Sequence, residues 1–293
     1  MTHRTASFVH GGHRLVYDVY GETGPMVVYI HGLLLDSDIN RGIAEALADQ
    51  GCRVVLLDLL GHGRSDAPTH ASEYRIDSYA DQIFGLLDHL GEESAVLGGV
   101  SLGANVSLLA ASERPERVRA LVLEMPVLEW AVPSAALIFA PLLLLAHYGR
   151  GLAHLVEGAI RRLPATPFPS MNSLVNAAGM PSERTAAVLH GVLVGPVCPT
   201  QEARARITVP TLILAHRNDL IHPFTDAHNL AEQMPNATLV RARSPLELRL
   251  FPRRLTGEIA SFLDALPSTS TDNAGGPSTG GRRQSTSKAS RAR

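Results

Sequence analysis

A serine between two glycines is the residue in this sequence best placed for covalent chemistry. It lies in Gly99-Val100-Ser101-Leu102-Gly103, after a short apolar run at residues 95–97 and before a helical pattern over residues 102–111. A serine on such a strand–turn–helix junction sits on a strained turn that lifts its hydroxyl above the carboxyl edge of a sheet. The N–H groups that open the helix face a developing oxyanion there. The motif therefore predicts Ser101 as a nucleophile in acyl transfer.

The segments around this turn alternate between apolar runs and helical patterns. Apolar runs of this kind are typical of parallel strands covered on both faces, and they alternate with helices of roughly 10–15 residues. We therefore expect an α/β fold, with a mostly parallel sheet, helices on both faces and an N-terminal hairpin. The expected strands are residues 7–10, 13–20, 26–30, 54–57, 95–97, 118–123, 211–215 and 238–242, and the expected helices are residues 38–50, 76–90, 102–111, 224–233 and 253–265.

This alternation stops between residues 126 and 200, which are apolar, helical in period and rich in proline. The stretch is too long for a simple connection, so we expect an inserted helical lid between two parts of one core, residues 1–125 and 201–266. Residues 267–293 hold almost nothing apolar and carry five basic residues against one acid. Such a composition predicts a disordered basic tail.

Composition excludes several classes of function. The formal net charge is -2, so we expect no nucleic-acid partner, and the two cysteines form neither a disulfide framework nor a metal-ligand pattern. No apolar signal segment follows Met1, and the most apolar stretch, residues 131–146, is shorter than the ~20 residues of a membrane span. We therefore expect a cytoplasmic protein with no metal and no stable membrane insertion.

Three further motifs, together with the serine turn, resemble the α/β-hydrolase superfamily over about residues 7–266. They are His31-Gly32-Leu33 after the first parallel strand, a D-x-x-G-x-G-x-S pattern in residues 58–66, and the loop of residues 218–223. The resemblance implies an oxyanion hole made by the N–H groups of Leu33 and Leu102. It implies that Asp219 is the acid of a catalytic triad. The other matched positions, His31, Gly32, Gly99 and Gly103, and the residues 58–66, are expected to shape the loops beside the site.

The sequence departs from this family at the catalytic histidine. Family members place it in a short loop after the last strand, a few residues before a proline that opens the final helix. Aligning on Pro252 puts Pro245 at that position, and no histidine follows His228. A serine hydroxyl is a poor nucleophile until an adjacent base takes its proton, so another group must supply that base.

His222 is the first candidate for the base. It lies three residues after Asp219, where the resemblance implies a position lining the pocket, and an imidazole with an ordinary pKa near 6.5 suits general-base catalysis. The alternative is that His222 opens a helix beside Pro223 and faces solvent or the lid. His216 is a poorer candidate, because packing at the end of the preceding strand is expected to direct it away.

Other groups are expected to have structural roles. His31 and His62 occupy ordinary family positions and are expected to brace loops. Glu247 falls in the loop that lacks the histidine, but a carboxylate is a weak base toward serine. We expect Glu247 to form an ion pair with Arg249 or Arg243.

The predicted lid contains two very apolar runs, residues 135–140 and 142–145. They are consistent with a wall for a lipophilic acyl or alkyl ligand, because ligand pockets are mostly apolar. Burial of the lid against the core would explain most of the same residues, and contact with a membrane surface is the third reading.

Two classes of function follow from these residues. The first is a serine hydrolase that needs no cofactor and cleaves a small or medium apolar carboxylic ester or a related acyl compound. The second is a non-catalytic ligand-binding protein that kept the pocket, suggested by Pro245. A cofactor-free lyase or oxygenase on the same scaffold stays open, because function belongs to the site and not to the architecture. The sequence sets neither the substrate nor the oligomeric state.

Overall fold

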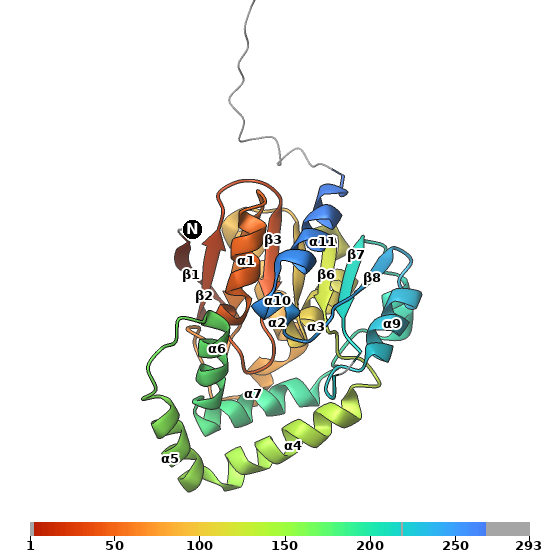
Figure 1. Ribbon diagram of the computed structural model, residues 1–293. Coiled ribbons are helices and arrows are strands. Elements are labelled where there is room, and N and C mark those ends of the chain that lie inside the picture. The colour runs from red at the N-terminus through yellow and green to blue at the C-terminus, as the bar shows by residue number, and fades with distance from the viewer. Residues whose placement is uncertain (1–2, 218, 268–293) are drawn as a thin grey trace, which may run out of the picture.

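The computed structural model describes residues 3–217 and 219–267, and an eight-stranded sheet forms its centre (Figure 1). The strand order is β1-β2-β4-β3-β5-β6-β7-β8. The pairs from β4 to β8 are parallel, whereas β1 and β2 form an antiparallel hairpin at one edge. The predicted α/β fold is therefore confirmed. The strands are Arg4–His10, His13–Tyr20, Met26–Ile30, Arg53–Asp58, Ala95–Val100, Val118–Glu124, Thr211–Ala215 and Ala237–Arg241.

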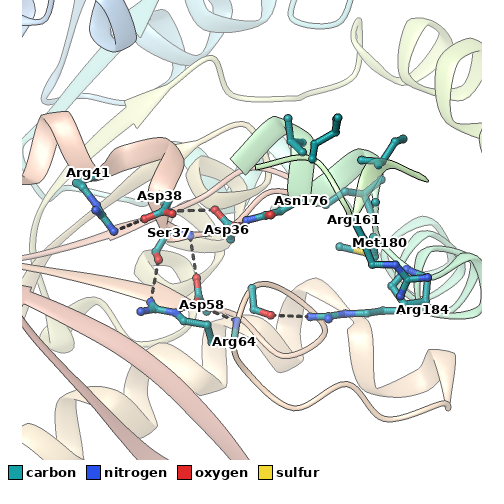
Figure 2. A pocket seen from close by; sticks show the side chains of 17 residues that line it. Asp36, Ser37, Asp38, Arg41, Asp58, Arg64, Arg161, Asn176, Met180 and Arg184 are labelled. Atoms are coloured by element: carbon teal, nitrogen blue, oxygen red, sulfur yellow. Dashed lines mark hydrogen bonds and ion pairs between the residues drawn. The ribbon is translucent and has the colours of Figure 1, made fainter. Parts of the chain in front are cut away.

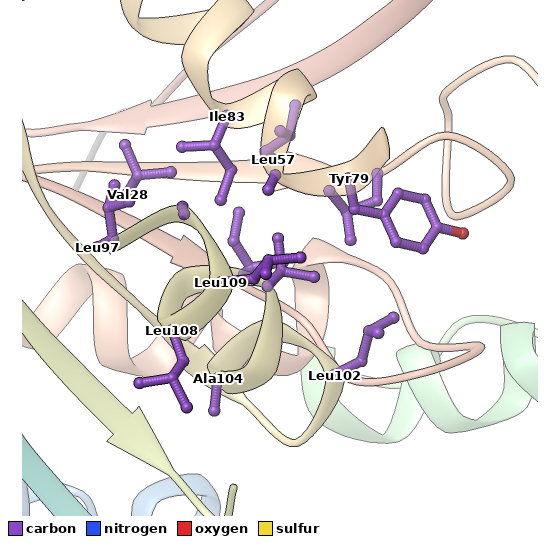
Figure 3. Packing of buried hydrophobic residues seen from close by; sticks show 14 of the residues in the cluster. Val28, Leu57, Tyr79, Ile83, Leu97, Leu102, Ala104, Leu108 and Leu109 are labelled. Atoms are coloured by element: carbon purple, nitrogen blue, oxygen red, sulfur yellow. The ribbon is translucent and has the colours of Figure 1, made fainter. Parts of the chain in front are cut away.

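One face of the sheet packs against helices α2 (Ile76–Leu90) and α3 (Leu102–Glu113). Because successive side chains of a strand point to opposite faces, this face receives alternate residues, among them Val28, Leu57 and Leu97 (Figure 3). All three are fully buried. This packing fixes the start of α3, which directly follows the serine turn.

The opposite face packs against helices α1 (Arg41–Ala48) and α11 (Arg253–Asp264). It receives the other set of alternate residues, such as Val27, Val54 and Val96, which are also fully buried. The central strands are thus covered on both faces, which accounts for their continuous apolar sequences.

The boundaries of two predicted elements differ from expectation for identifiable reasons. The helix expected over residues 38–50 begins as a 3-10 turn, Ser37–Asn40, in which the amide of Asp38 donates to the Asp36 side chain, and α1 proper starts at Arg41. The strand expected over residues 95–97 continues to Val100. A Cβ on Gly98 would lie 2.7 Å from the carbonyl oxygen of Val122, so the glycine lets β5 approach β6 closely.

Helices fill the segment between β6 and β7, as predicted, and lie beyond the carboxyl ends of the strands (Figure 1). The side chains of Ser173 and Asn176 contact Asp36 of the core at 3.1 and 2.8 Å. The remaining helices, inside and outside this insertion, are η2 Ala71–Tyr74, η3 Pro115–Arg117, α4 Val132–Tyr148, α5 Arg150–Ile160, α6 Pro169–Ala178, α7 Ser182–Val194, α8 Gln201–Ala205, α9 Phe224–Gln233 and α10 Glu247–Leu250.

Burial against the core does not explain most of the apolar lid residues, contrary to our expectation. Phe139 and Leu143 pack against the main core, but Leu137, Leu144 and Leu145 are at least half exposed. Helix α4, which carries these residues, lies at the outside of the molecule with α7 between it and the sheet (Figure 1). Only one side of α4 therefore reaches the core. The predicted tail, apart from Pro267, lies outside the described residues.

Candidate active site

Ser101 lies on a strained turn between β5 and α3. Its backbone has φ 54° and ψ −111°, in a region that non-glycine residues rarely adopt. A Cβ on Gly99 or on Gly103 would lie 2.6 or 2.3 Å from the carbonyl oxygen of Ile30. Both positions therefore require glycine, because a side chain at either would collide with the end of β3. The turn leaves the Ser101 side chain at the carboxyl edge of the parallel strands.

His222 contacts both Ser101 and Asp219. Its Nε2 atom lies 2.9 Å from the Ser101 hydroxyl oxygen, and its Nδ1 atom lies 2.9 Å from Oδ2 of Asp219. An imidazole whose Nδ1–H donates to the carboxylate keeps Nε2 as an acceptor for the serine hydroxyl. The structure thus brings together the three residues singled out in the sequence, in the order hydroxyl, imidazole and carboxylate.

The carboxylate of Asp219 is held by four donors. Its Oδ1 atom accepts the backbone N–H groups of Ile221 at 2.8 Å and His222 at 3.1 Å, while Oδ2 accepts from the rings of His222 and His216. Burial acts to raise the pKa of Asp219. The hydrogen bond and charge interaction with the His222 ring, and the hydrogen bonds from the two backbone amides, outweigh burial and hold the pKa well below its usual range. The carboxylate is therefore ionised and fixed in orientation.

His216 lies on the Asp219 carboxylate and does not contact Ser101, so it is the poorer candidate for the base, as expected; its contact with Asp219 was not predicted. Its side chain is 3% exposed, and Nε2 lies 3.0 Å from Oδ2 of Asp219. The chain turns after β7 so that the carboxylate folds back over the end of the strand. One signal was present in the sequence: His216 and His222 each lie three residues from Asp219, on either side.

The amides of Leu33 and Leu102 lie in the two segments that flank Ser101. Leu33 follows β3, Leu102 opens α3, and both residues line the same cavity as Ser101. Within residues 3–217 and 219–267, neither amide donates a hydrogen bond to another protein group. The next residue, Leu34, has φ 63°, which turns the chain away from the strand.

His31 and His62 are fully buried and contact loop backbone. The Nδ1 atom of His31 contacts the carbonyl of Gly32 at 2.8 Å, and its Nε2 accepts the N–H of Leu59 at 3.1 Å. The Nδ1 atom of His62 contacts the carbonyl of Leu60 at 3.0 Å, and the two rings lie 4.7 Å apart. Burial lowers the pKa of both rings, so both are neutral. These contacts are those of loop braces.

The segment of residues 58–66 forms a tight loop around the buried carboxylate of Asp58. That carboxylate accepts the N–H of Ser37 at 2.8 Å and both the backbone N–H and the Nε–H of Arg64, at 3.1 and 2.7 Å. Gly63 has φ 49°, and a Cβ there would meet the Asp58 side chain at 2.4 Å. The segment is held together by these contacts within the core, and none of its groups contacts Ser101.

The loop after β8, where the family histidine was expected, is held by different contacts. Pro245 is exposed, and the buried Glu247 accepts from Nε of Arg254 at 2.7 Å and from the backbone N–H of Arg243. The expected ion pair of Glu247 with the side chain of Arg249 or Arg243 was wrong. Arg249 instead contacts Glu124 at 2.8 Å beneath the sheet edge. Glu247 is therefore engaged away from Ser101.

Two of the cavities between the lid and the core, one beside Ser101 and one polar, are separate from each other. The first, about 100 Å³, adjoins Ser101 and is almost entirely apolar. The second, about 630 Å³, is polar and shares no lining residue with the first; Figure 2 shows Arg41 paired with Asp38 and Arg64 paired with Asp58 along its wall. The first cavity is lined by Leu33, Ile76, Ser101, Leu102, Asn105, Val127, Val132, Ala135, Ala136, Phe139, Val192, Leu193, Val197 and Ile221.

The described part of the chain has neither a group of side chains suited to a metal ion nor a helix suited to cross a membrane. Residues 3–217 and 219–267 hold no group of three or more histidine, cysteine, aspartate or glutamate side chains arranged to bind a metal ion. None of the helices in these residues is both long and apolar enough to cross a bilayer.

Comparison with known proteins identifies the family. Residues 25–244 match the model of the alpha/beta hydrolase fold, so the chain belongs to the α/β-hydrolase family. The match covers the serine turn, the loop of Asp219 and His222, and the whole insertion. It is the fold that the sequence motifs indicated.

Several relatives are enzymes by name. A protein of Stutzerimonas stutzeri named as a carbamate hydrolase, RutD, is 31% identical over 201 residues, which are 65% of this chain and 72% of that protein. A haloalkane dehalogenase of Mycolicibacterium paratuberculosis is 32% identical over 115 residues, or 38% of each chain. The enol-lactonase of Burkholderia xenovorans has a similar fold, with a TM-score of 0.72 and 20% identity over 88% of this chain and 100% of that one.

Proposed function

We propose that the chain is a serine hydrolase that cleaves small or medium apolar carboxylic esters, or related acyl compounds, through an acyl-enzyme. The observation that carries the proposal is the contact of His222 Nε2 with the Ser101 hydroxyl at 2.9 Å, with Asp219 behind the same ring. A base in hydrogen-bond contact with the nucleophile, and itself oriented by a third group, is the arrangement that activates a serine.

In the first half of the reaction, the Ser101 oxygen attacks the carbonyl carbon while its proton passes to Nε2 of His222. The negative charge that develops on the carbonyl oxygen would be held by the N–H groups of Leu33 and Leu102. Asp219, ionised and fixed by its four donors, stabilises the imidazolium. The carbon–oxygen bond to the leaving group then breaks, and the alcohol leaves with the proton of His222.

In the second half, a water molecule gives its proton to Nε2 of His222 and attacks the acyl carbon. Collapse of the second tetrahedral intermediate breaks the bond to Ser101, returns the proton to the serine oxygen and releases the carboxylic acid. Neither half needs a metal or an organic cofactor. The same three side chains serve both halves, as in other acyl-enzyme mechanisms.

The cavity beside Ser101 supports the class of substrate. It is small, about 100 Å³, and hydrocarbon side chains from α4, α7 and the core form nearly all of its wall. A charged acyl group would lose its hydration there without finding a partner, at a cost of several kcal/mol. We therefore expect short and medium apolar acyl groups to react faster than charged ones.

Labelling by a fluorophosphonate probe tests the mechanism, because the probe reacts only with an activated serine. We expect the protein to be labelled and Ser101→Ala to abolish labelling, with Ser107→Ala as the matched control, since Ser107 is a buried serine of α3 that does not contact His222. Absence of labelling, under conditions that modify a known esterase, would contradict the proposal. It would favour the non-catalytic reading, in which apolar ligands raise the melting temperature without turnover.

A further inference from the structure

Helix α4 carries apolar side chains on all of its sides. From Val132 to Tyr148 it contains no aspartate, glutamate, lysine or arginine. Its inner side supplies Val132, Ala135 and Phe139 to the cavity beside Ser101. A helix that is apolar all round is normally covered all round, so the outer side requires a partner.

That outer side is exposed. Leu137 is 78% exposed and Leu144 57%, with Trp130 at one end of the helix 65% exposed and Tyr148 at the other end 79%. On the next helix, Leu155 is 73% exposed. We call these five residues the lid face. The helices α4 and α5 that carry it lie at the end of the molecule away from the sheet (Figure 1), and it exceeds the scattered apolar residues found on most protein surfaces.

An apolar cavity lies under the same two helices. Its volume is about 360 Å³, and its wall is mostly hydrocarbon, with Glu157, Ser182 and Thr185 among the lining residues. Leu142, Leu145 and Val156 line it and are themselves partly exposed, so the cavity adjoins the lid face. A cavity of this kind suits a hydrocarbon chain better than it suits the side chains of a flat protein surface.

The charges around the lid face are positive. Residues 130–168 contain three arginines, Arg150, Arg161 and Arg162, and one acid, Glu157. Glu157 is buried and lies 3.9 Å from Arg161, which also lines the polar cavity, whereas Arg162 is exposed. The exposed Glu129 and Glu183 beside this segment pair with Arg204 and His154. The exposed rim of the lid therefore favours an anionic partner.

The C-terminal segment of the chain does not suit this surface. Residues 268–293 contain no valine, leucine, isoleucine, methionine or aromatic residue, and their net charge is positive. A segment of this composition can neither cover exposed leucines nor pair with arginines.

We propose that the lid face docks on the surface of a lipid bilayer that contains anionic headgroups. Exposed leucines would enter the acyl boundary, Trp130 and Tyr148 would lie at the headgroup level where amphipathic rings are favoured, and Arg161 and Arg162 would meet phosphates. The docking is peripheral and requires no span. The role of this docking depends on the proposed function. Apolar esters that partition into lipid would reach Ser101 along the inner side of α4.

Vesicle co-sedimentation tests the docking. We expect binding to vesicles of phosphatidylcholine with phosphatidylglycerol, weaker binding to phosphatidylcholine alone, and loss of binding at high salt. The double variant Leu137→Glu with Leu144→Glu should lower the partition coefficient at least tenfold. The matched control is Val9→Glu with Phe251→Glu, which changes two residues of similar exposure, 72% and 75%, outside the insertion; it should bind as the unaltered protein does.

Two further measurements separate the alternatives. Fluorophosphonate labelling in the absence of lipid should be the same in the lid variant, which shows that it is folded, and Ser101→Ala should still bind vesicles. Docking and hydrolysis can thus fail independently. Equal vesicle binding by the lid and control variants would overturn the proposal. So would a dimer in sedimentation velocity that Leu137→Glu dissociates, since a second copy of the chain would then cover the lid face.

A second inference comes from the contacts of His216, and it also rests on the proposed function. His216 touches neither Ser101 nor its cavity, yet its buried ring shares Oδ2 of Asp219 with His222. Without that donor, three donors would remain on the carboxylate, and only the His222 ring would contact Oδ2. We infer that His216 is a positioning residue, which holds Asp219 toward His222 and stabilises its negative charge.

Its test uses the pH profile of ester hydrolysis. His216→Phe should lower kcat/KM about tenfold, the effect of one hydrogen bond to a charged group. It should also move the acid limb of the profile to higher pH, because a carboxylate with one donor fewer holds the proton of the adjacent imidazole more strongly. His216→Gln, whose amide can donate, should restore part of the rate. A folded His216→Phe protein with an unchanged profile and rate would overturn this role, while loss of all activity in Ser101→Ala tests the hydrolase separately.

Discussion

Two loops at the carboxyl edge of the sheet differ in what they hold. The loop after β7 carries Asp219 and His222. These two residues contact each other, and His222 also contacts Ser101. The loop after β8 carries Pro245 on its surface and a buried Glu247, which is held by Arg254. In the first loop polar groups face the nucleophile, whereas in the second they face the scaffold.

In the proposed mechanism, acid and base come from the same loop. Asp219 and His222 are three residues apart, and the same carboxylate that orients the ring also accepts the backbone N–H of His222. The turn therefore positions the base through its own hydrogen bonds. The β8 loop supplies no group to Ser101 and is instead held by ion pairs, among them Arg249 with Glu124.

Removing the imidazole of the β7 loop should have the largest effect. His222→Ala is expected to lower the rate of p-nitrophenyl ester hydrolysis at least about 100-fold, the lower end for loss of a general base. His228→Ala, an exposed histidine on α9, is the control and should retain the unaltered rate. If the His222 variant turned over normally, the base would lie elsewhere and the contrast between the loops would vanish.

Removing the carboxylate of the β8 loop should affect stability and leave catalysis intact. Glu247→Gln weakens a partly solvent-screened contact with Arg254, so we expect a loss of about 1–2 kcal/mol in the free energy of unfolding. Urea denaturation measures this loss, with the exposed Glu258→Gln as control. A large fall in kcat in the folded Glu247 variant would show that the β8 loop also serves the chemistry.

Acid should destabilise the β7 loop through Asp219. Its folded pKa lies below the unfolded value of about 3.9, so its contribution to stability is complete above about pH 5 and is lost as the pH falls through the folded pKa. The free energy of unfolding should therefore fall more steeply below pH 4 in the unaltered protein than in Asp219→Asn. Urea midpoints at pH 5, 4 and 3 measure the slopes, and Asp264→Asn, an exposed carboxylate, should follow the unaltered protein.

Changing Pro245 should have the smallest effect. The residue is exposed and contacts neither Ser101 nor His222 through any hydrogen bond, so Pro245→Ala should alter the ester hydrolysis rate less than about twofold and stability by less than about 0.5 kcal/mol. Steady-state kinetics and urea denaturation check both values. A marked loss of rate would mean that the proline shapes the site after all.

Much of the fold could be predicted because its signals are local. Strand–turn–helix order and two glycines place Ser101, and apolar runs place the central strands. His222 could be proposed from its distance of three residues from Asp219. The contact of His216 was not predicted, although His216 lies the same three residues from Asp219, because its orientation depends on how the chain turns after β7.

The lid illustrates a second limit. A run of leucines has the same sequence whether it lines a cavity, packs on the core or faces outward, because apolar composition alone does not specify the partner. Helix α4 does all three, with Phe139 inside, Leu143 against the core and Leu137 exposed. Only the three-dimensional arrangement separates these sides.

The amides of Ile221 and His222 give the β7 loop an internal reporter. Both donate to Oδ1 of Asp219, the oxygen opposite the one that receives the ring. Their hydrogen–deuterium exchange should consequently be slow whenever acid and base are assembled, in the resting protein and without any substrate. A drop in protection at these two positions would mark the moment at which the carboxylate and the imidazole separate together.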